Sequence, residues 1–299
     1  MKKIKILAIV VTLLVLFLGF KFIFSDYSIY RFSVSKETRL KYLNTVDKVS
    51  SNKAQINWRE VLAIDAVINY GKVDTATEKN IENIAERFLV EDNNTYKVAT
   101  MESVMESFSK DKRDVKKANT YLKVINKKRD EELEGKSELS KRKLEFINSI
   151  KDEAIKTYKE TGILPSVIIG QAALESNWGR SELASKYKNL FGIKADSSWK
   201  GEKINLSTSE YYNIKIKDEF RVYTSVKDSI KDFGKFLTTN PRYTKSGVFN
   251  KKTYKEQIKA IENAGYSTIA NEKGEKIYAS YVTDIIMSND LQLIDWSLN

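Results

Sequence analysis

The chain has 299 residues, enough for one large or two modest domains, and its hydrophobic fraction of 41% supports a folded core. Its net charge is +11, and it contains no cysteine and no histidine. This composition excludes Cys–His and Ser–His hydrolytic sites, and it excludes zinc sites built from His and Cys ligands. Hydrolysis by carboxylates remains open, and glycoside cleavage is the commonest use of that chemistry.

Residues 1–26 have the composition of a membrane anchor. Lysines precede an apolar run at 6–20, which resumes at 22–24, so that residues 4–24 match the ~20 residues needed to cross a bilayer. We predict an uncleaved transmembrane helix with a cytoplasmic N-terminus, because the lysines come first. A cleaved signal peptide is the alternative, but no small-residue cleavage site follows the run. Either way, the rest of the chain is expected outside the cytoplasmic membrane, where nucleic acid is not an expected partner.

The region 27–140 is predicted to be a charged, helical stem or accessory region. Apolar residues recur at helical spacing in the segments 35–49, 58–69, 77–90, 98–108 and 115–125. Asp65 lies among apolar neighbours in the second segment. We interpret it as a capped or paired structural carboxylate, since buried charges are usually paired, and a degenerate copy of a downstream motif is the alternative. The region is assigned a positioning or partner-binding role, and a membrane-protein partner remains open.

A segment dense in charge, 127–143, marks the predicted domain boundary, with Gly135 in its middle. Apolar periodicity resumes at Leu144 and leads to Gly162. We therefore predict three parts: the anchor at 1–26, the helical region at 27–140 and a second folded domain at 141–299.

The stretch LPSVIIGQAALESNWG, residues 164–179, predicts a buried helix that ends in an acid. Pro165 suits the first helical turn, and the apolar residues after it recur at helical spacing. Glu175 follows this run and lies close to Trp178 in the sequence. Burial at this point would raise the pKa of the carboxyl group, as a general acid requires near neutral pH. An ordinary solvated glutamate near a helix end is the alternative.

Beyond Glu175, a short helix at 181–184 and a loop through 187–194 lead to a predicted hairpin. Alternating residues in 203–211 and 214–223 predict its two strands, and Glu210 lies on the first. Glu210 is either a surface residue of a lysine-rich hairpin or a second carboxylate that activates water or attacks the substrate. Helices at 226–237, 253–263 and 277–287 complete the chain, with Asn240-Pro241 ending the first of them.

Five motifs follow one another in this half of the chain: ALESNWGRS at 173–181, NLFGIK at 189–194, the pair Glu210-Tyr211, FRVYTSVKDSIKDF at 220–233 and NPRY at 240–243. In that order they resemble the glucosaminidase domain of bacterial cell-wall hydrolases, glycoside hydrolase family 73. The resemblance covers residues 147–293. It implies a mainly α, lysozyme-like α+β domain with a small β-hairpin. It also implies endo-β-N-acetylglucosaminidase activity on peptidoglycan glycan strands, without a metal or cofactor.

The resemblance also assigns roles to residues. Glu175 would protonate the leaving oxygen, Glu210 or the 2-acetamido group of the substrate would assist at C1, and Tyr243 would position the substrate. The other predicted substrate-binding residues lie in the loop that shapes the cleft or carry aromatic rings for sugar stacking: Trp178, Asn189, Phe191, Trp199, Tyr211 and Tyr223. Aromatic residues are more often part of a core, so most of these rings should be buried.

Two other interpretations stay open. The same fold supports muramidases and lytic transglycosylases, which cut the other glycosidic bond of the strand. A non-catalytic wall-binding or assembly protein could also keep this fold. The connection between Tyr266 and Tyr278 is longer than the family pattern. That departure concerns the rim of the cleft and leaves the assignment of Glu175 in place.

Overall fold

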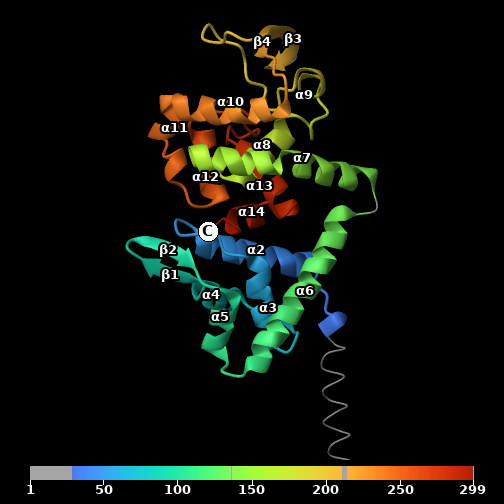
Figure 1. The fold of residues 1–299 in the computed structure, drawn as a ribbon, viewed down its shortest axis with the longest axis vertical. Coiled ribbons are helices and arrows are strands. Elements are labelled where there is room, and N and C mark those ends of the chain that lie inside the picture. Colours follow the sequence, from blue (N-terminus) through green and yellow to red (C-terminus); the bar gives the residue numbers. More distant parts are fainter. Residues whose placement is uncertain (1–28, 136, 211–213, 299) are drawn as a thin grey trace, which may run out of the picture. The chain divides into compact units, whose positions relative to one another are not determined.

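The computed structural model describes residues 29–135, 137–210 and 214–298 (Figure 1). The side chains of residues 207–210 and 214–217 are outside this description. Across the described ranges, no helix is both long enough and apolar enough to cross a membrane. The predicted span at 4–24 lies outside these ranges and stays a prediction.

The chain forms two compact units. The first comprises the described residues up to Val49 with the segments Asn57–Val90 and Ala99–Glu132. The second comprises the segments Ser50–Ile56 and Glu91–Val98 and the chain from Leu133 onward. The described part of the chain consists mainly of helices with two small hairpins, so the predicted fold class is confirmed at this level.

The N-terminal half of the chain is helical except for one hairpin. Its elements are α2 (Lys36–Ser50), α3 (Trp58–Ile68), η1 (Val73–Thr75), α4 (Glu78–Glu86), β1 (Leu89–Asp92), β2 (Thr95–Val98), α5 (Met101–Phe108) and α6 (Lys112–Glu134). Asp65 on α3 is buried, and it accepts hydrogen bonds from the hydroxyl of Tyr42 and from the amide of Asn69, the latter at 2.6 Å. The prediction of a capped or paired structural carboxylate is confirmed in its capped form, since both of these partners are neutral hydrogen-bond donors.

The predicted helix at 77–90 is wrong at its C-terminal end. Helix α4 stops at Glu86, and Leu89 begins a strand instead. Asn93 and Asn94 both adopt left-handed backbone angles, with φ of 49° and 63°. Such a pair of residues makes a tight hairpin turn whose twist suits two paired strands. Because of this turn, Leu89 and Val90 belong to a strand and not to the end of the preceding helix.

The C-terminal half of the chain places the candidate site. Its elements are α7 (Glu138–Thr161), α8 (Pro165–Glu175), α9 (Glu182–Tyr187), β3 (Lys203–Glu210), β4 (Ile214–Arg221), α10 (Val226–Thr239), α11 (Pro241–Lys245), η2 (Val248–Asn250), α12 (Tyr254–Asn263), α13 (Tyr278–Ser288) and α14 (Gln292–Trp296). Strands β3 and β4 are antiparallel, from Lys203 opposite Arg221 to Glu210 opposite Ile214, which confirms the predicted hairpin.

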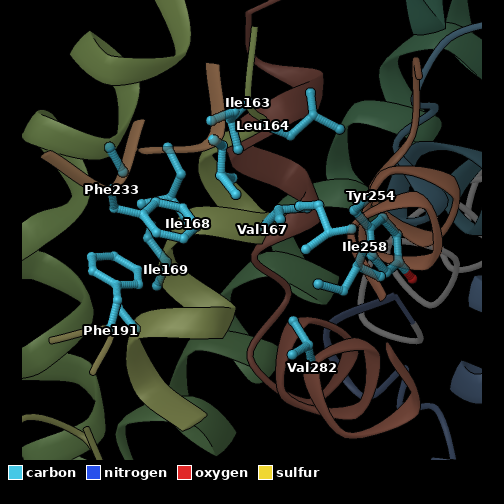
Figure 2. Packing of buried hydrophobic residues seen from close by; sticks show 14 of the residues in the cluster. Ile163, Leu164, Val167, Ile168, Ile169, Phe191, Phe233, Tyr254, Ile258 and Val282 are labelled. Carbon is cyan, nitrogen blue, oxygen red and sulfur yellow. The ribbon is translucent and has the colours of Figure 1, made fainter. Parts of the chain in front are cut away.

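Helix α8 is the centre of the second unit, because α7, α12, α13 and α14 all pack against it. Figure 2 shows Val167, Ile168 and Ile169 of α8 inside the cluster of buried apolar side chains. Gly170 lets α13 approach closely, since a Cβ at this position would lie 2.9 Å from Cγ1 of Ile286. Each fully buried aliphatic side chain of this kind contributes about 1.5–3 kcal/mol, so the helix is held firmly along its length.

The end of α7 and the start of α8 are each explained by particular residues. Gly162 ends α7 in a left-handed conformation with φ of 75°. Pro165 occupies the first turn of α8, and the N-cap residue Leu164 offers no capping side chain. Asp295 of α14 supplies the cap instead: its carboxylate accepts the N–H of Ser166 at 2.9 Å and the hydroxyl of Ser166 at 2.5 Å. Burial raises the pKa of Asp295 to about 7.

Candidate functional site

Glu175 is the last residue of α8, and it opens into a cleft of about 550 Å³. The walls of this cleft come from the loop after α9, from β4, from α10 and α11, and from the loop before α13. The lining residues besides Glu175 are Leu183, Phe191, Gly192, Ile193, Lys194, Asp196, Phe220, Phe236, Arg242, Tyr266, Ser267 and Ile269. The position at a helix end thus lets one carboxyl group project from a rigid core into open space.

The pKa of Glu175 is raised, and desolvation is the larger cause. Part of the side chain is exposed to the cleft, but the surrounding protein replaces enough water around the carboxyl group to disfavour its charged form. The hydroxyl of Tyr278 donates a hydrogen bond to Oε1 at 2.8 Å, which acts in the opposite direction and is the weaker effect. The predicted direction of the pKa shift is confirmed.

A buried chain of hydrogen bonds fixes the orientation of this carboxyl group. The side-chain amide of Gln171, one turn earlier on α8, donates to the hydroxyl oxygen of Tyr278 at 2.9 Å. Because a tyrosine hydroxyl has a single proton, accepting from Gln171 leaves that proton free to point at Glu175. Oε1 of Glu175 is thereby the acceptor of this bond, so that a proton on the acid would sit on Oε2.

Two tyrosines of the site were missed by the sequence reasoning. Tyr266 lines the cleft, and its ring centroid lies 5.5 Å from that of Tyr278. Burial raises the pKa of both hydroxyls well above the ordinary value, and the nearby charge of Glu175 adds to the shift, so both phenols stay neutral. Tyr278 follows Glu175 by 103 residues, and no local pattern connects them.

Asp196 is a second carboxylate of the cleft that the sequence reasoning did not single out. The N–H and the hydroxyl of Ser198 donate to its Oδ1 at 2.9 and 2.5 Å. These bonds lower the pKa of Asp196, and the charge of Arg221, whose guanidinium lies 3.5 Å from Oδ2, adds to the effect. The pKa values of Asp196 and Glu175 are therefore shifted in opposite directions within one cleft.

The predicted partner carboxylate, Glu210, is the last residue of β3, and its side chain is not described. Tyr211 lies outside the described residues. Tyr243 is fully buried and does not line the cleft. Its hydroxyl accepts a hydrogen bond from Arg242 at 2.7 Å, so it supports a cleft residue from behind.

The loop residues Asn189 and Phe191 have different roles. Asn189 is buried: its amide donates to the carbonyls of Ile193 and Arg221 at 3.0 and 2.9 Å, and its oxygen accepts from the N–H of Ile193. It holds the loop against β4 and does not line the cleft. Phe191 does line the cleft, and its ring stacks on Phe233 at 4.0 Å.

The remaining aromatic candidates lie away from the cleft lining. Trp199 contacts Tyr223 edge to face at 5.6 Å, and the hydroxyl of Tyr223 donates to Asp232 at 2.7 Å. Trp178 lines a different hollow, described below. As for metals, the part of the chain that the structure describes contains no group of three acidic side chains close enough to hold an ion.

Comparisons with known proteins agree on the C-terminal half. Residues 151–291 match the Glucosaminidase family, described as mannosyl-glycoprotein endo-beta-N-acetylglucosaminidase. The peptidoglycan hydrolase FlgJ of Vibrio parahaemolyticus is 39% identical over 129 residues, which are 41% of this chain and 42% of FlgJ. The exo-glucosaminidase LytG of Bacillus subtilis is 33% identical over 156 residues, which are 50% of this chain and 52% of LytG.

Among solved structures, the catalytic domain of the autolysin Auto from Listeria monocytogenes matches with a TM-score of 0.45 and 34% sequence identity. The match covers 56% of this chain and 96% of that domain. By contrast, the chain spans about half the length of the two curated relatives, FlgJ and LytG.

Proposed function

We propose that this chain hydrolyses peptidoglycan at the β-1,4 bond that follows N-acetylglucosamine, because its residues 151–291 form a domain of the glucosaminidase family of glycoside hydrolases. The observation that supports this most directly is the carboxyl group of Glu175, which has a raised pKa, faces a cleft and is held by Tyr278. Glycoside hydrolysis needs such a protonated acid beside the bond to be cut.

In the proposed mechanism Glu175 is the general acid. Its Oε2 donates a proton to the glycosidic oxygen as the bond from that oxygen to C1 of N-acetylglucosamine breaks, and N-acetylmuramic acid leaves with the oxygen. Glu175 then becomes a carboxylate, and the hydrogen bond that Tyr278 donates to Oε1 stabilises the new charge. The same bond is weaker while the acid is protonated, so Tyr278 stabilises the transition state more than the ground state.

Positive charge develops at C1 as the bond breaks, and a carboxylate or another nucleophilic oxygen nearby stabilises it until water adds to C1 and completes the hydrolysis. Glu210 is proposed from the family resemblance, and the substrate's own acetamido oxygen is the alternative. Asp196 is a further candidate because it lines the same cleft as Glu175 and remains ionised. Glu210→Gln and Asp196→Asn, made singly and together, separate these choices. If the double variant keeps the wild-type rate, the acetamido group is the one that assists at C1.

The test of the proposed function is a product analysis. The full-length chain, purified in detergent, digests isolated peptidoglycan, and the new sugar ends are reduced and identified by mass spectrometry. Reduced N-acetylglucosamine ends are the expected result, and the sizes of the products distinguish internal cuts from release at strand ends. Reduced N-acetylmuramic acid or anhydro ends would reassign the chain as a muramidase or lytic transglycosylase. Wall binding without products would favour a non-catalytic role.

We further propose that residues 4–24 anchor the chain in the cytoplasmic membrane, with the N-terminus inside and residues 27–299 outside. The support is the apolar run itself and the lysines that precede it. Protease added to intact spheroplasts should then remove the C-terminal part of the chain while a tag at residue 1 stays protected. A membrane-protein partner for residues 27–140 stays an open prediction, which crosslinking of the anchored chain would test.

A further inference from the structure

A second hollow, of about 440 Å³, lies on the same unit and shares no lining residue with the cleft of Glu175. We call it the Trp178 groove and define it by Arg142 and Phe146 of α7, Trp178 and Arg180 of the loop after α8, and Lys188 after α9. The cleft and the groove meet at α9, because its residue Leu183 lines the cleft and the next residue, Ala184, lines the groove.

One side of the groove is a wall of two aromatic rings that are held in place. The rings of Phe146 and Trp178 meet edge to face with centroids 6.0 Å apart. The loop reaches Phe146 because Gly179 has no side chain: a Cβ there would lie 3.1 Å from the Phe146 ring, and its φ is 75°. The hydroxyl of Ser176 accepts the N–H of Gly179 at 2.7 Å and fixes the turn. Trp178 therefore has a defined position, half-buried at the edge of the groove.

Positive charge dominates the rim. Arg180 is exposed, and its side chain makes no hydrogen bond or ion pair with any residue that the structure describes. Lys188 donates from Nζ to the carbonyl of Ser185 and pairs with no described acid. Arg142 has one exposed partner, Glu138, at 3.1 Å. Lys143 adds a further cation, with Nζ 4.9 Å above the Trp178 ring, and Glu145 is the only acid among the residues that line the groove.

We propose that the Trp178 groove binds the carboxylate-bearing peptide stem of peptidoglycan while the glycan strand occupies the cleft of Glu175. This inference rests on the proposed function for its choice of ligand. Arginine and lysine pair with carboxylates, and an aromatic wall offers apolar contact to sugar and side-chain carbon. A polyol phosphate chain would use the cations but would leave the Trp178 and Phe146 wall without a partner, so the stem peptide is the better match.

The test measures binding by the full-length chain carrying Glu175→Gln, so that the ligand is not cleaved. The two ligands are a disaccharide–tetrapeptide and the same compound with its carboxylates converted to amides, which removes charge and keeps size. We expect tighter binding of the acidic ligand, and we expect Arg142→Gln with Arg180→Gln to reduce that preference about tenfold or more. The matched control is Lys231→Gln with Lys235→Gln, two exposed lysines of α10 outside the groove.

Equal binding of both ligands, or a preference that survives in the groove variant, would overturn the proposal. So would a groove-dependent affinity for poly(glycerol phosphate) in place of the peptide. The Trp178→Ala change serves as a second variant, since it removes the aromatic wall and should weaken both ligands alike. All these binding measurements use the Glu175→Gln protein, so their result can be interpreted even if the wild-type chain fails to digest peptidoglycan. In the same way, the digestion test can be interpreted whatever the binding result is.

Discussion

The hydroxyl of Tyr278 lies 2.8 Å from Oε1 of Glu175 and donates a hydrogen bond to it. This contact joins the first residue of α13 to the last residue of α8, across 103 positions of the sequence. It separates the two oxygens of the carboxyl group into one that accepts and one that is free to give up a proton. The chemistry proposed for the cleft depends on that separation.

Glu175→Gln should abolish hydrolysis and leave the thermal unfolding temperature nearly unchanged. The amide keeps the shape of the side chain and can still accept from Tyr278 through its oxygen, but it cannot act as an acid. A positioned general acid contributes about 10²–10⁴ in rate, so a loss of that size is expected. The measurement is release of reducing ends from peptidoglycan, with calorimetry for stability.

Glu182→Gln, an exposed change on α9, is the matched control and should keep full activity. A Glu175→Gln protein with wild-type activity would remove Glu175 from the mechanism, whatever the stability result.

Tyr278→Phe should shift the pH dependence of hydrolysis to higher pH. The hydrogen bond from Tyr278 lowers the pKa of Glu175, so its removal raises that pKa further. Activity requires the protonated acid and is lost as pH rises through this pKa, which places the alkaline limb of the profile at higher pH in the variant. The rate at the optimum should fall, because the new carboxylate loses its donor.

The matched change Tyr281→Phe, at a half-exposed position on the same helix, should leave the pH profile in place. An unmoved alkaline limb in Tyr278→Phe would show that another group sets it. The variant also leaves the Gln171 amide without its acceptor, which costs about 1–3 kcal/mol of stability.

The sequence predicted Glu175 because its signal is local. A proline at the first helical turn, an apolar run and an acid at its end all lie within 16 residues. The partners of Glu175 carry no such signal, since Gln171 reads as one more residue of a buried helix and Tyr278 comes from a distant helix. The raised pKa of the carboxyl group could therefore be predicted, but the direction in which the group points could not.

Trp178 shows the opposite case, in which a local signal was misleading. Its nearness in sequence to Glu175 suggested a place in the same cleft. In the structure Asn177, Trp178 and Gly179 all adopt left-handed angles, with φ of 48°, 58° and 75°, and Trp178 lines the other hollow. Asparagine and glycine commonly adopt these angles, but nothing in the sequence indicates that the tryptophan between them does the same.

Asp295→Asn should flatten the pH dependence of stability. The pKa of Asp295 is raised to about 7 in the folded chain, above its ordinary value, so its contribution is present at low pH and is lost as pH rises through about 7. Between about pH 5 and pH 8 the loss amounts to roughly 2–3 kcal/mol. The asparagine variant keeps the cap on Ser166 without a titrating group, so the difference between the two unfolding curves isolates this residue.

Asp295→Ala removes the cap altogether and should destabilise the chain at every pH, by about 1–3 kcal/mol for the unpaired Ser166 groups. Parallel stability curves for wild type and Asp295→Asn across this range would show that Asp295 does not titrate there.

Gly234→Ala should destabilise the second unit by about 1–3 kcal/mol, because α10 packs closely on α7 at this glycine. A Cβ at position 234 would lie 2.6 Å from Cγ2 of Thr157, a buried atom that cannot move aside. Thr157→Ser removes that methyl group, so the double variant should regain part of the lost stability, which chemical denaturation of both proteins would measure. Thr161 also lies 3.1 Å from the added atom, so the recovery should be incomplete. If Thr157→Ser and Gly234→Ala were simply additive, the approach of α7 to α10 would not be what requires a glycine here.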